Sequence, residues 1–233
     1  MANASILIPS TLADHKDVEE HGAMVSIHIK WQDAQKEIAV CEECVHQWKG
    51  RVTEPLAIGE IPNPPPLVKI LFVGVAPTNR TGRNKGAHFY SSAADNLRRG
   101  LFRLLKNSFD VPLKELSVEA GNAAFHRQGY FFVHAGKARP VGQDAPPEEA
   151  LVFCSNQHLR KEVLLLNPRA ICFLGVTNLT TVARLLFQRN ISETPVQAFC
   201  DGWTGWVALA PQPVRGGERR TALVLERLLT LVK

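Results

Sequence analysis

The sequence feature that most constrains the fold is an apolar, β-branched run, Val68–Pro77, which stops at a glycine and a proline and then turns polar. A run of this kind is typical of a central strand that is buried on both faces of a sheet. In open α/β sheets, ligands bind just beyond the carboxyl ends of the strands. We therefore expect Gly74–Arg83 to form the floor of a functional site.

The rest of the chain repeats this pattern of an apolar run that ends at a loop. Further strands are expected at residues 129–135, 169–175 and 205–211. Helices are expected at residues 93–109, 147–166, 177–187 and 219–232. Strands that alternate with helices in this way predict an α/β fold, a three-layer αβα sandwich around a central four-stranded, mainly parallel sheet.

The amino-terminal part, residues 1–66, has a weaker pattern. Residues 25–31 alternate like a short strand, residues 34–48 fit a helix, and the stretch ends in a proline-rich boundary at residues 62–66. With 233 residues and 45% hydrophobic content, the chain can build one large core and a small appendage. We interpret residues 1–66 as an amino-terminal layer packed on an α/β domain of residues 67–233.

The charge balance indicates a polyanionic partner. Lysine and arginine number 27 against 22 aspartate and glutamate, which gives a net charge of +5. The excess is concentrated in Arg80, Arg83, Lys85, Arg98, Arg99 and Arg103, and again in Arg215, Arg219 and Arg220. Nucleic acid is the partner that such clusters favour, and a solvated basic face is the alternative.

The amino terminus and the cysteines bear on the cellular compartment. The first nine residues have no basic region, their apolar stretch is too short for a signal peptide, and no run approaches membrane length. We therefore expect a cytoplasmic protein without membrane contact. Five cysteines are an odd number for a disulfide framework, so their spacing matters more than their pairing.

Several short motifs fall on the expected loop rim, in order along the chain. They are Gly74-Val-Ala-Pro77 with Asn79-Arg-Thr-Gly-Arg83 and Phe89, Lys137-Ala-Arg-Pro140 with Pro147-Glu-Glu149, Leu166–Gly175, and Ala210-Pro-Gln-Pro213. Together these motifs resemble the uracil-DNA glycosylase superfamily, particularly its iron-sulfur-containing bacterial and archaeal branches. The resemblance covers roughly residues 65–233.

The resemblance implies a monomeric enzyme that extrudes a nucleotide from DNA and cuts the bond between base and sugar. It assigns base binding to Gly74, Val75, Ala76, Pro77, Phe89 and His134. Phe89 matches the stacking phenylalanine of the family, and its alternative role is that of a core residue. The resemblance assigns DNA binding to Arg80, Arg83, Pro211, Pro213, Val214, Arg215 and Arg219. Val214 would be an apolar wedge in the gap left by the flipped base, whereas an exposed loop with a chance arginine is the alternative.

Three positions depart from the family pattern. The second family motif normally opens with a histidine that stabilises the departing base, and Ala210 stands there. An asparagine that reads the edge of uracil is replaced by His134, and the water-orienting residue after the first glycine is Val75. We expect His134 to donate to the leaving base, with Asn79 and His88 as further candidates for catalysis. A buried structural histidine is the alternative for His134.

The cysteines match the resembled branch in part. Cys41, Cys44 and Cys154 occupy three of its four cluster positions, and the remaining position is Ala138. Three alternatives stay open: an iron-sulfur cluster completed by another ligand, a zinc ion held with the help of His46, or no metal. Cys172 lies in an expected strand and fits the core.

Taken together, the sequence predicts a DNA glycosylase for a damaged or modified base other than plain uracil, in DNA repair or in defence against modified foreign DNA. The alternative is a DNA- or lesion-binding module of the same fold that has lost its chemistry.

Overall fold

The computed structural model describes residues 12–57, 59–78, 88–113, 117–142, 145–214 and 216–233, and for residues 12–24 it describes the backbone alone. A five-stranded sheet has the order β3-β2-β5-β7-β6. Its strands are β2 (Ile70–Gly74), β3 (Tyr130–His134), β5 (Ala170–Leu174), β6 (Val196–Cys200) and β7 (Trp203–Ala210). The predicted α/β sandwich is confirmed, and the four predicted strands are its four parallel strands.

The fifth strand, β6, was not predicted. It pairs with β7 in the antiparallel sense at the edge of the sheet, from Val196 opposite Val207 to Cys200 opposite Trp203. Only one of its faces is buried, and the Phe199 side chain is 71% exposed. A short edge strand of this kind gives no continuous apolar run, so sequence periodicity is a weak signal for it.

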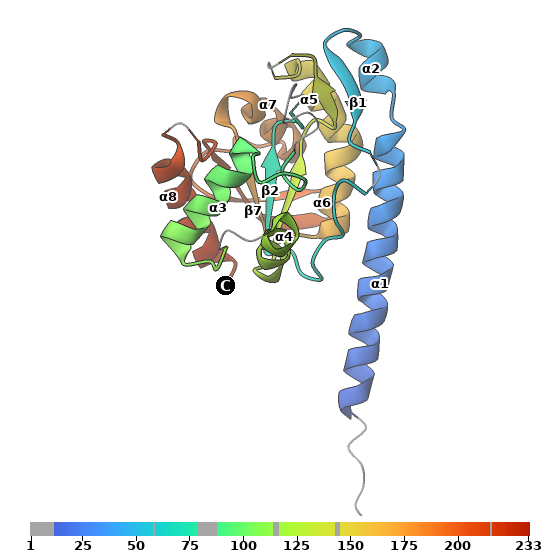
Figure 1. The fold of residues 1–233 in the computed structure, drawn as a ribbon. Coiled ribbons are helices and arrows are strands. Elements are labelled where there is room, and N and C mark those ends of the chain that lie inside the picture. The colour runs from blue at the N-terminus through green and yellow to red at the C-terminus, as the bar shows by residue number, and fades with distance from the viewer. Residues whose placement is uncertain (1–11, 58, 79–87, 114–116, 143–144, 215) are drawn as a thin grey trace, which may run out of the picture.

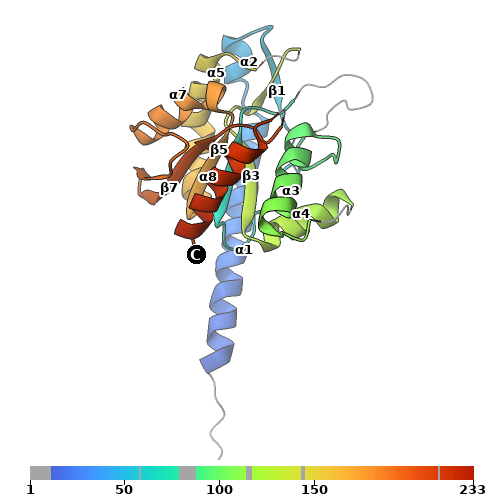
Figure 2. The same ribbon diagram turned by 90° about the vertical axis from the view of Figure 1, so that its left-hand side faces the viewer.

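Helices cover both faces of the sheet (Figures 1 and 2). One layer contains α3 (Asn96–Phe109), α4 (Val118–Arg127) and α8 (Glu218–Leu231). The other contains α5 (Glu148–Cys154), a π-helical turn (Ser155–Leu159), α6 (Arg160–Leu166) and α7 (Val176–Phe187). The helix predicted at residues 147–166 is therefore interrupted by the π turn, and α4 was not predicted.

The amino-terminal layer begins with a long helix, α1 (Leu12–Ala39), which packs on α6 and extends beyond the body of the fold (Figure 1). The predicted strand at residues 25–31 is wrong, because Trp31, Gln35 and Ile38 form one buried helical face. The Trp31 ring meets Phe131 of β3 edge to face, with centroids 5.2 Å apart. Tertiary packing thus overrides the local alternation.

The layer continues with α2 (Glu43–Gln47) and β1 (Val52–Pro55). β1 pairs antiparallel with β4 (Ala138–Pro140), which directly follows β3. This small second sheet ties the amino-terminal layer to the loop rim. No helix in the described ranges combines the length and the apolar character that crossing a membrane requires.

Candidate active site

A cavity of about 1070 Å³ lies at the carboxyl ends of the parallel strands, against α3. Its strand-end residues are Val75 and Ala76 after β2, His134 at the end of β3, and Gln212 and Val214 after β7. Phe89 also lines it, as do Asn96, Arg99, Arg103, Lys106 and Asn107 of α3. The structure therefore brings several of the predicted site residues to one place. The predicted residues Asn79, Arg80, Arg83 and Arg215 lie outside the described residues.

The floor of the cavity depends on Gly74, the last residue of β2. A Cβ atom at Gly74 would lie 2.6 Å from the ring of Phe132, so the close packing of β2 on this ring requires glycine. The pairing of β2 with β3 continues past both strands, because Ala135 N–H donates to Gly74 O and Gly136 N–H to Val75 O, each at 2.8 Å. The main chain beside Val75 is thus held in place.

Phe89 lies inside an aromatic cluster. Its ring stacks on Phe132, with centroids 4.0 Å apart and an angle of 10° between the planes. The Phe89 side chain is 1% exposed, and Phe102 and Tyr90 meet its ring edge to face. Phe89 is thus both a core residue and part of the cavity wall. The Phe125 ring, with its centroid 5.6 Å away, and the Arg98 guanidinium, 5.8 Å from the ring centroid, also pack on Phe89.

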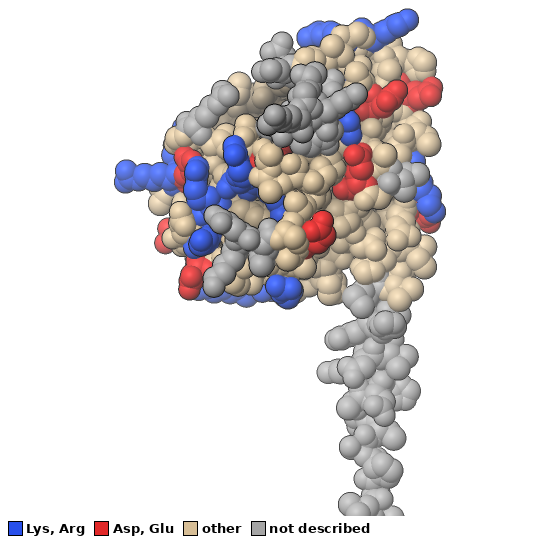
Figure 3. Space-filling view, viewed as in Figure 1, with Lys and Arg blue, Asp and Glu red and all other residues tan. Residues whose placement is uncertain are grey.

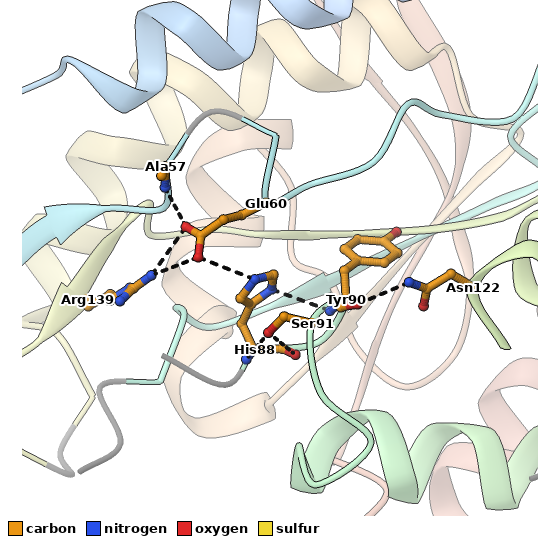
Figure 4. A network of polar contacts seen from close by, with 7 residues as sticks. All are labelled: Ala57, Glu60, His88, Tyr90, Ser91, Asn122 and Arg139. Atoms are coloured by element: carbon orange, nitrogen blue, oxygen red, sulfur yellow. Dashed lines mark hydrogen bonds and ion pairs between the residues drawn. The ribbon is translucent and has the colours of Figure 1, made fainter. Parts of the chain in front are cut away.

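A polar network holds the segment that carries Phe89 (Figure 4). The buried His88 ring accepts a hydrogen bond from Tyr90 N–H at 3.4 Å through Nδ1, and its Nε2 lies 3.7 Å from Oε1 of Glu60. Glu60 in turn pairs with Arg139 of β4 at 3.3 Å. Burial lowers the pKa of His88, and Glu60 offsets this in part. Glu60 therefore links the amino-terminal layer to the segment next to the cavity.

Arg98 also fixes this segment from α3. Its guanidinium donates to Phe89 O at 3.0 Å, to Val118 O at 3.2 Å and to the side chain of Asn122. The guanidinium also lies over the Phe102 ring, 4.2 Å from its centroid. Arg98 is 4% exposed, so it belongs to the core and not to the basic surface suggested by the sequence.

His134 ends β3 with its side chain in the cavity wall. Burial holds the pKa of His134 well below its ordinary value, and the nearby charges of Lys137, His88 and Arg139 lower it further. The imidazole is therefore neutral at pH 7 and has one N–H to donate. Its ring meets Phe132 edge to face, with centroids 4.8 Å apart.

A buried ion pair supports the main chain of His134. The Lys137 ammonium donates to His134 O and to Oε2 of Glu162, each at 2.5 Å. Both side chains of the pair are almost fully buried, and Gln35 of α1 donates to the other oxygen of Glu162 at 3.4 Å. Burial raises the pKa of Glu162, and Lys137 opposes this. Helices α1 and α6 thus contribute to holding the end of β3.

At the end of β7, the loop of residues 210–214 is tightly fixed but offers little polar chemistry. Ala210 is fully buried, and its carbonyl accepts from Gly175 N–H at 2.9 Å. Thr221 Oγ1 donates to Pro211 O at 2.7 Å. A Cβ atom at Gly100 of α3 would lie 2.0 Å from Pro213 O, so the loop rests directly on the helix.

Gln212 is a cavity residue to which the sequence analysis gave no role. Its amide nitrogen lies 3.6 Å from the place a Cβ atom on Gly175 would occupy, near Val75. The sequence feature that could have indicated a role for Gln212 is its position between two prolines, two residues after a strand that ends at the rim. Pro213 is buried, and Val214, the predicted wedge, is half-buried in the cavity wall.

Basic side chains gather over α3 and α8 on the face shown in Figure 3. Arg103 pairs with Glu218 at 2.5 Å, and Arg220 pairs with Glu193. Arg219 is exposed and has no ion-pair partner in the described part of the chain. It is therefore free to meet a phosphate.

The cysteines lie where the amino-terminal layer meets α5. The Cys44 thiol donates to Cys154, which raises the pKa of Cys44 and lowers that of Cys154 to about 7. Lys137 N–H also donates to Cys154 Sγ, at 3.1 Å. Cys41 lies close enough for its charge to act on Cys44 and on Cys154, and burial raises its pKa.

These residues do not fit a four-thiolate cluster, because the expected fourth position, Ala138, is a buried methyl group. His46, the alternative zinc ligand, is exposed and contacts Glu42 at 3.1 Å. Within the described ranges, no three histidine, cysteine, aspartate or glutamate side chains are arranged to hold a metal ion. Zinc at Cys41, Cys44 and Cys154, or an iron-sulfur cluster there completed by another ligand, stays a prediction, and so does the alternative of no metal.

Comparison with known families gives one clear result. The model of the Uracil DNA glycosylase superfamily matches residues 61–225, which is more than half of the chain and includes every described residue of the cavity wall. No curated protein matches the chain.

Proposed function

Because the chain belongs to the uracil-DNA glycosylase superfamily, we propose that it hydrolyses the N-glycosidic bond of a damaged or modified base in DNA, a base other than plain uracil. The observation that carries the proposal is the position of His134, a neutral imidazole in the cavity wall. The family histidine is absent, and Ala210 in its place is fully buried.

The cavity suits an extruded base. Taking a nucleotide out of the stack costs a few kcal/mol, which binding in a shaped pocket must offset. Phe89 would stack on the base after a shift of its ring, which is 1% exposed in the absence of DNA, and the Gly74–Pro77 floor would lie below the base. Val214 would enter the gap left by the flipped base, and Arg215 would hold a phosphate. Gln212 adds an amide that can donate to and accept from the edge of the base.

Cleavage moves the two electrons of the bond between sugar and base onto the base, and leaves positive charge on the sugar. Water then adds to the sugar carbon and loses a proton, which gives an abasic site and the free base. A fixed donor at the base stabilises the developing negative charge. His134 N–H would be that donor, because His134 is neutral and its main chain is held by Lys137.

The change from asparagine to histidine is the reason for proposing a base other than uracil. An asparagine amide presents a donor and an acceptor side by side, whereas a neutral imidazole presents them on separate ring nitrogens. The base edge that fits His134 and Gln212 must therefore differ from the edge that fits the family asparagine.

A second candidate is a DNA-binding module without catalytic activity, in DNA repair or in defence against modified foreign DNA. It is favoured by Ala210 and Val75, two apolar residues where many family members carry polar groups. In that case His134 would recognise the base without assisting its departure.

The test is incubation of the protein with a panel of oligonucleotides, each carrying one modified base, followed by alkali cleavage at abasic sites. We expect strand breaks with one modified base or a small group of them, and weaker cleavage of the uracil oligonucleotide. Tight binding without strand breaks across the panel would favour the silent module instead.

A further inference from the structure

The exposed face of α3 is unusual in composition. Asn96, Arg99, Arg103, Lys106 and Asn107 recur at helical spacing and all five side chains line the same cavity as His134. This face therefore has three cations and two amides, and α3 contains no aspartate or glutamate. A helix that covers a sheet needs only one apolar face, so the fold does not require the charges on the exposed face to be all positive.

Two of the three cations are not neutralised. In the part of the chain that the structure describes, Arg99 and Lys106 have no ion-pair partner. Arg99 is oriented by its neighbour, because its guanidinium donates to Oδ1 of Asn96 at 2.7 Å. Arg103 is partly neutralised by Glu218 of α8, at 2.5 Å.

The position of α3 relative to the cavity is fixed by its contacts with the segment of Phe89 and with the loop after β7. The Asp95 carboxylate caps the helix by accepting from Arg98 N–H at 2.8 Å, and the Arg98 side chain holds the segment of Phe89. Gly100 lets the Pro213–Val214 loop rest on the helix. The basic face therefore begins next to the place where a base would enter.

We propose that this face of α3, Asn96, Arg99, Arg103, Lys106 and Asn107, binds successive phosphates of one DNA strand beside the nucleotide that occupies the cavity. The inference rests on the proposed function, because it takes the cavity as the place of the flipped base. From Arg99 to Lys106 the helix rises about 10 Å. Along the axis of the duplex, one strand of DNA presents about three phosphates over that length, which matches the three cations.

The asparagines complete the contact. Asparagine side chains donate to phosphate and sugar oxygens in DNA complexes, and such contacts set the register of the protein on the strand without reading sequence. A binding surface of this composition carries no base specificity. The cavity and not α3 would therefore choose the base.

The test measures the affinity of the whole chain for a fluorescent DNA duplex without a modified base, at a series of salt concentrations. Each phosphate contact contributes about 0.9 to the slope of log affinity against log salt. The double variant Arg99→Ala and Lys106→Ala should therefore flatten the slope by about 2 units. The matched control removes two exposed cations elsewhere, Lys49→Ala and Arg184→Ala, and should leave the slope as in the wild type.

A third variant acts in the opposite direction. Glu218→Gln removes the carboxylate that partly neutralises Arg103, so the slope should become steeper, by less than the roughly 0.9 of one full phosphate contact. A solvated basic face without DNA contact would show neither change. Circular dichroism melting of each variant separates loss of contact from loss of folding.

An unchanged slope in the α3 double variant, or equal flattening in the control, would overturn the inference. The duplex carries no cleavable base, so the result does not depend on catalysis. Excision with an unchanged slope would reject this surface and leave the glycosylase proposal standing. A flatter slope without excision from any oligonucleotide would support this DNA-binding surface and reject the glycosylase proposal.

Discussion

The ends of β3 and β7 lie on the same rim and differ in what they offer. β3 ends in His134, a neutral imidazole whose main chain is held by the buried Lys137–Glu162 pair. β7 ends in Ala210, a buried methyl group followed by a loop that Thr221 and Gly100 hold in place. The scaffold is held at both ends, but the terminal strand residue itself is polar only in β3; after β7 the nearest polar side chain in the cavity wall is Gln212, two residues further on.

Close packing of the rim and the presence of a polar group at a strand end are therefore separate properties of this site. The loop after β7 packs closely on α3 although its strand ends in the apolar Ala210. Such a loop can still position Gln212 and Val214 in the cavity wall. We therefore expect the end of β3 to carry the leaving-group chemistry.

The largest effect is expected at the end of β3. Without the His134 donor, His134→Ala should slow base excision a hundredfold or more, or about 3 kcal/mol in the barrier, and leave DNA affinity nearly unchanged. Single-turnover excision and a DNA titration measure the two quantities. His158→Ala is the control, because His158 is equally buried but lies in the π turn away from the cavity.

A second variant places an amide at the same position. His134→Asn restores the residue of the resembled family and should shift the preference toward uracil. Full activity of His134→Ala with unchanged base preference would show that the end of β3 does not carry the chemistry.

The next effect concerns the loop after β7. Alanine in place of a helical glycine usually stabilises a protein by up to about 1 kcal/mol. At Gly100 we expect the opposite sign, a loss of about 1–3 kcal/mol, because the added methyl group would collide with the Pro213 carbonyl. Urea denaturation measures the change. Ser108→Ala, at an exposed position of the same helix, should be neutral or slightly stabilising, and a stable Gly100→Ala protein would mean that the loop is loose.

A smaller effect is expected at Thr221. Thr221→Val removes the hydrogen bond to Pro211 O and should cost about 1 kcal/mol of unfolding free energy. Thr230→Val is the matched control for Thr221→Val, since Thr230 lies on the same helix and donates to Glu226 O at an exposed site. Its cost should stay within about 0.5 kcal/mol. Equal costs at the two positions would indicate that Thr221 does not anchor the loop.

The smallest effect is expected from pH. Because the pKa of His134 is well below its ordinary value, the imidazole stays neutral as pH falls from 8 to about 6.5. Lys137, His88 and Arg139, the groups whose charges act on it, all oppose its protonation. The single-turnover excision rate should therefore be flat across this range. A fall in rate centred near the ordinary histidine pKa would show that His134 titrates as an exposed group.

Much of the fold could be predicted because buried parallel strands leave continuous apolar runs. The four runs at β2, β3, β5 and β7 predicted the central sheet, and the glycine that ends β2 and the proline after it predicted the position of the rim. The edge strand β6 and the whole of α4 lack such runs. The alternation at residues 25–31 was misleading, because Trp31 is buried by packing on Phe131, a contact that a local pattern does not encode.

The site was predictable only where a side chain follows directly from a strand end. His134 and Val75 could be placed on the rim in this way. The roles of Arg98 and Gln212 could not, since one depends on contacts with Phe89, Val118 and Asn122, and the other on the course of the loop after β7. Sequence spacing alone made Arg98 part of a basic surface, although its guanidinium is buried by tertiary packing.

Excision of a base other than uracil is tested by mass spectrometry of the small molecules released from a mixture of oligonucleotides that carry modified bases and uracil. We expect a free base other than uracil, released in an amount equal to that of the abasic strand, and released far more slowly by His134→Ala. No free base, or uracil as the main product, would contradict it.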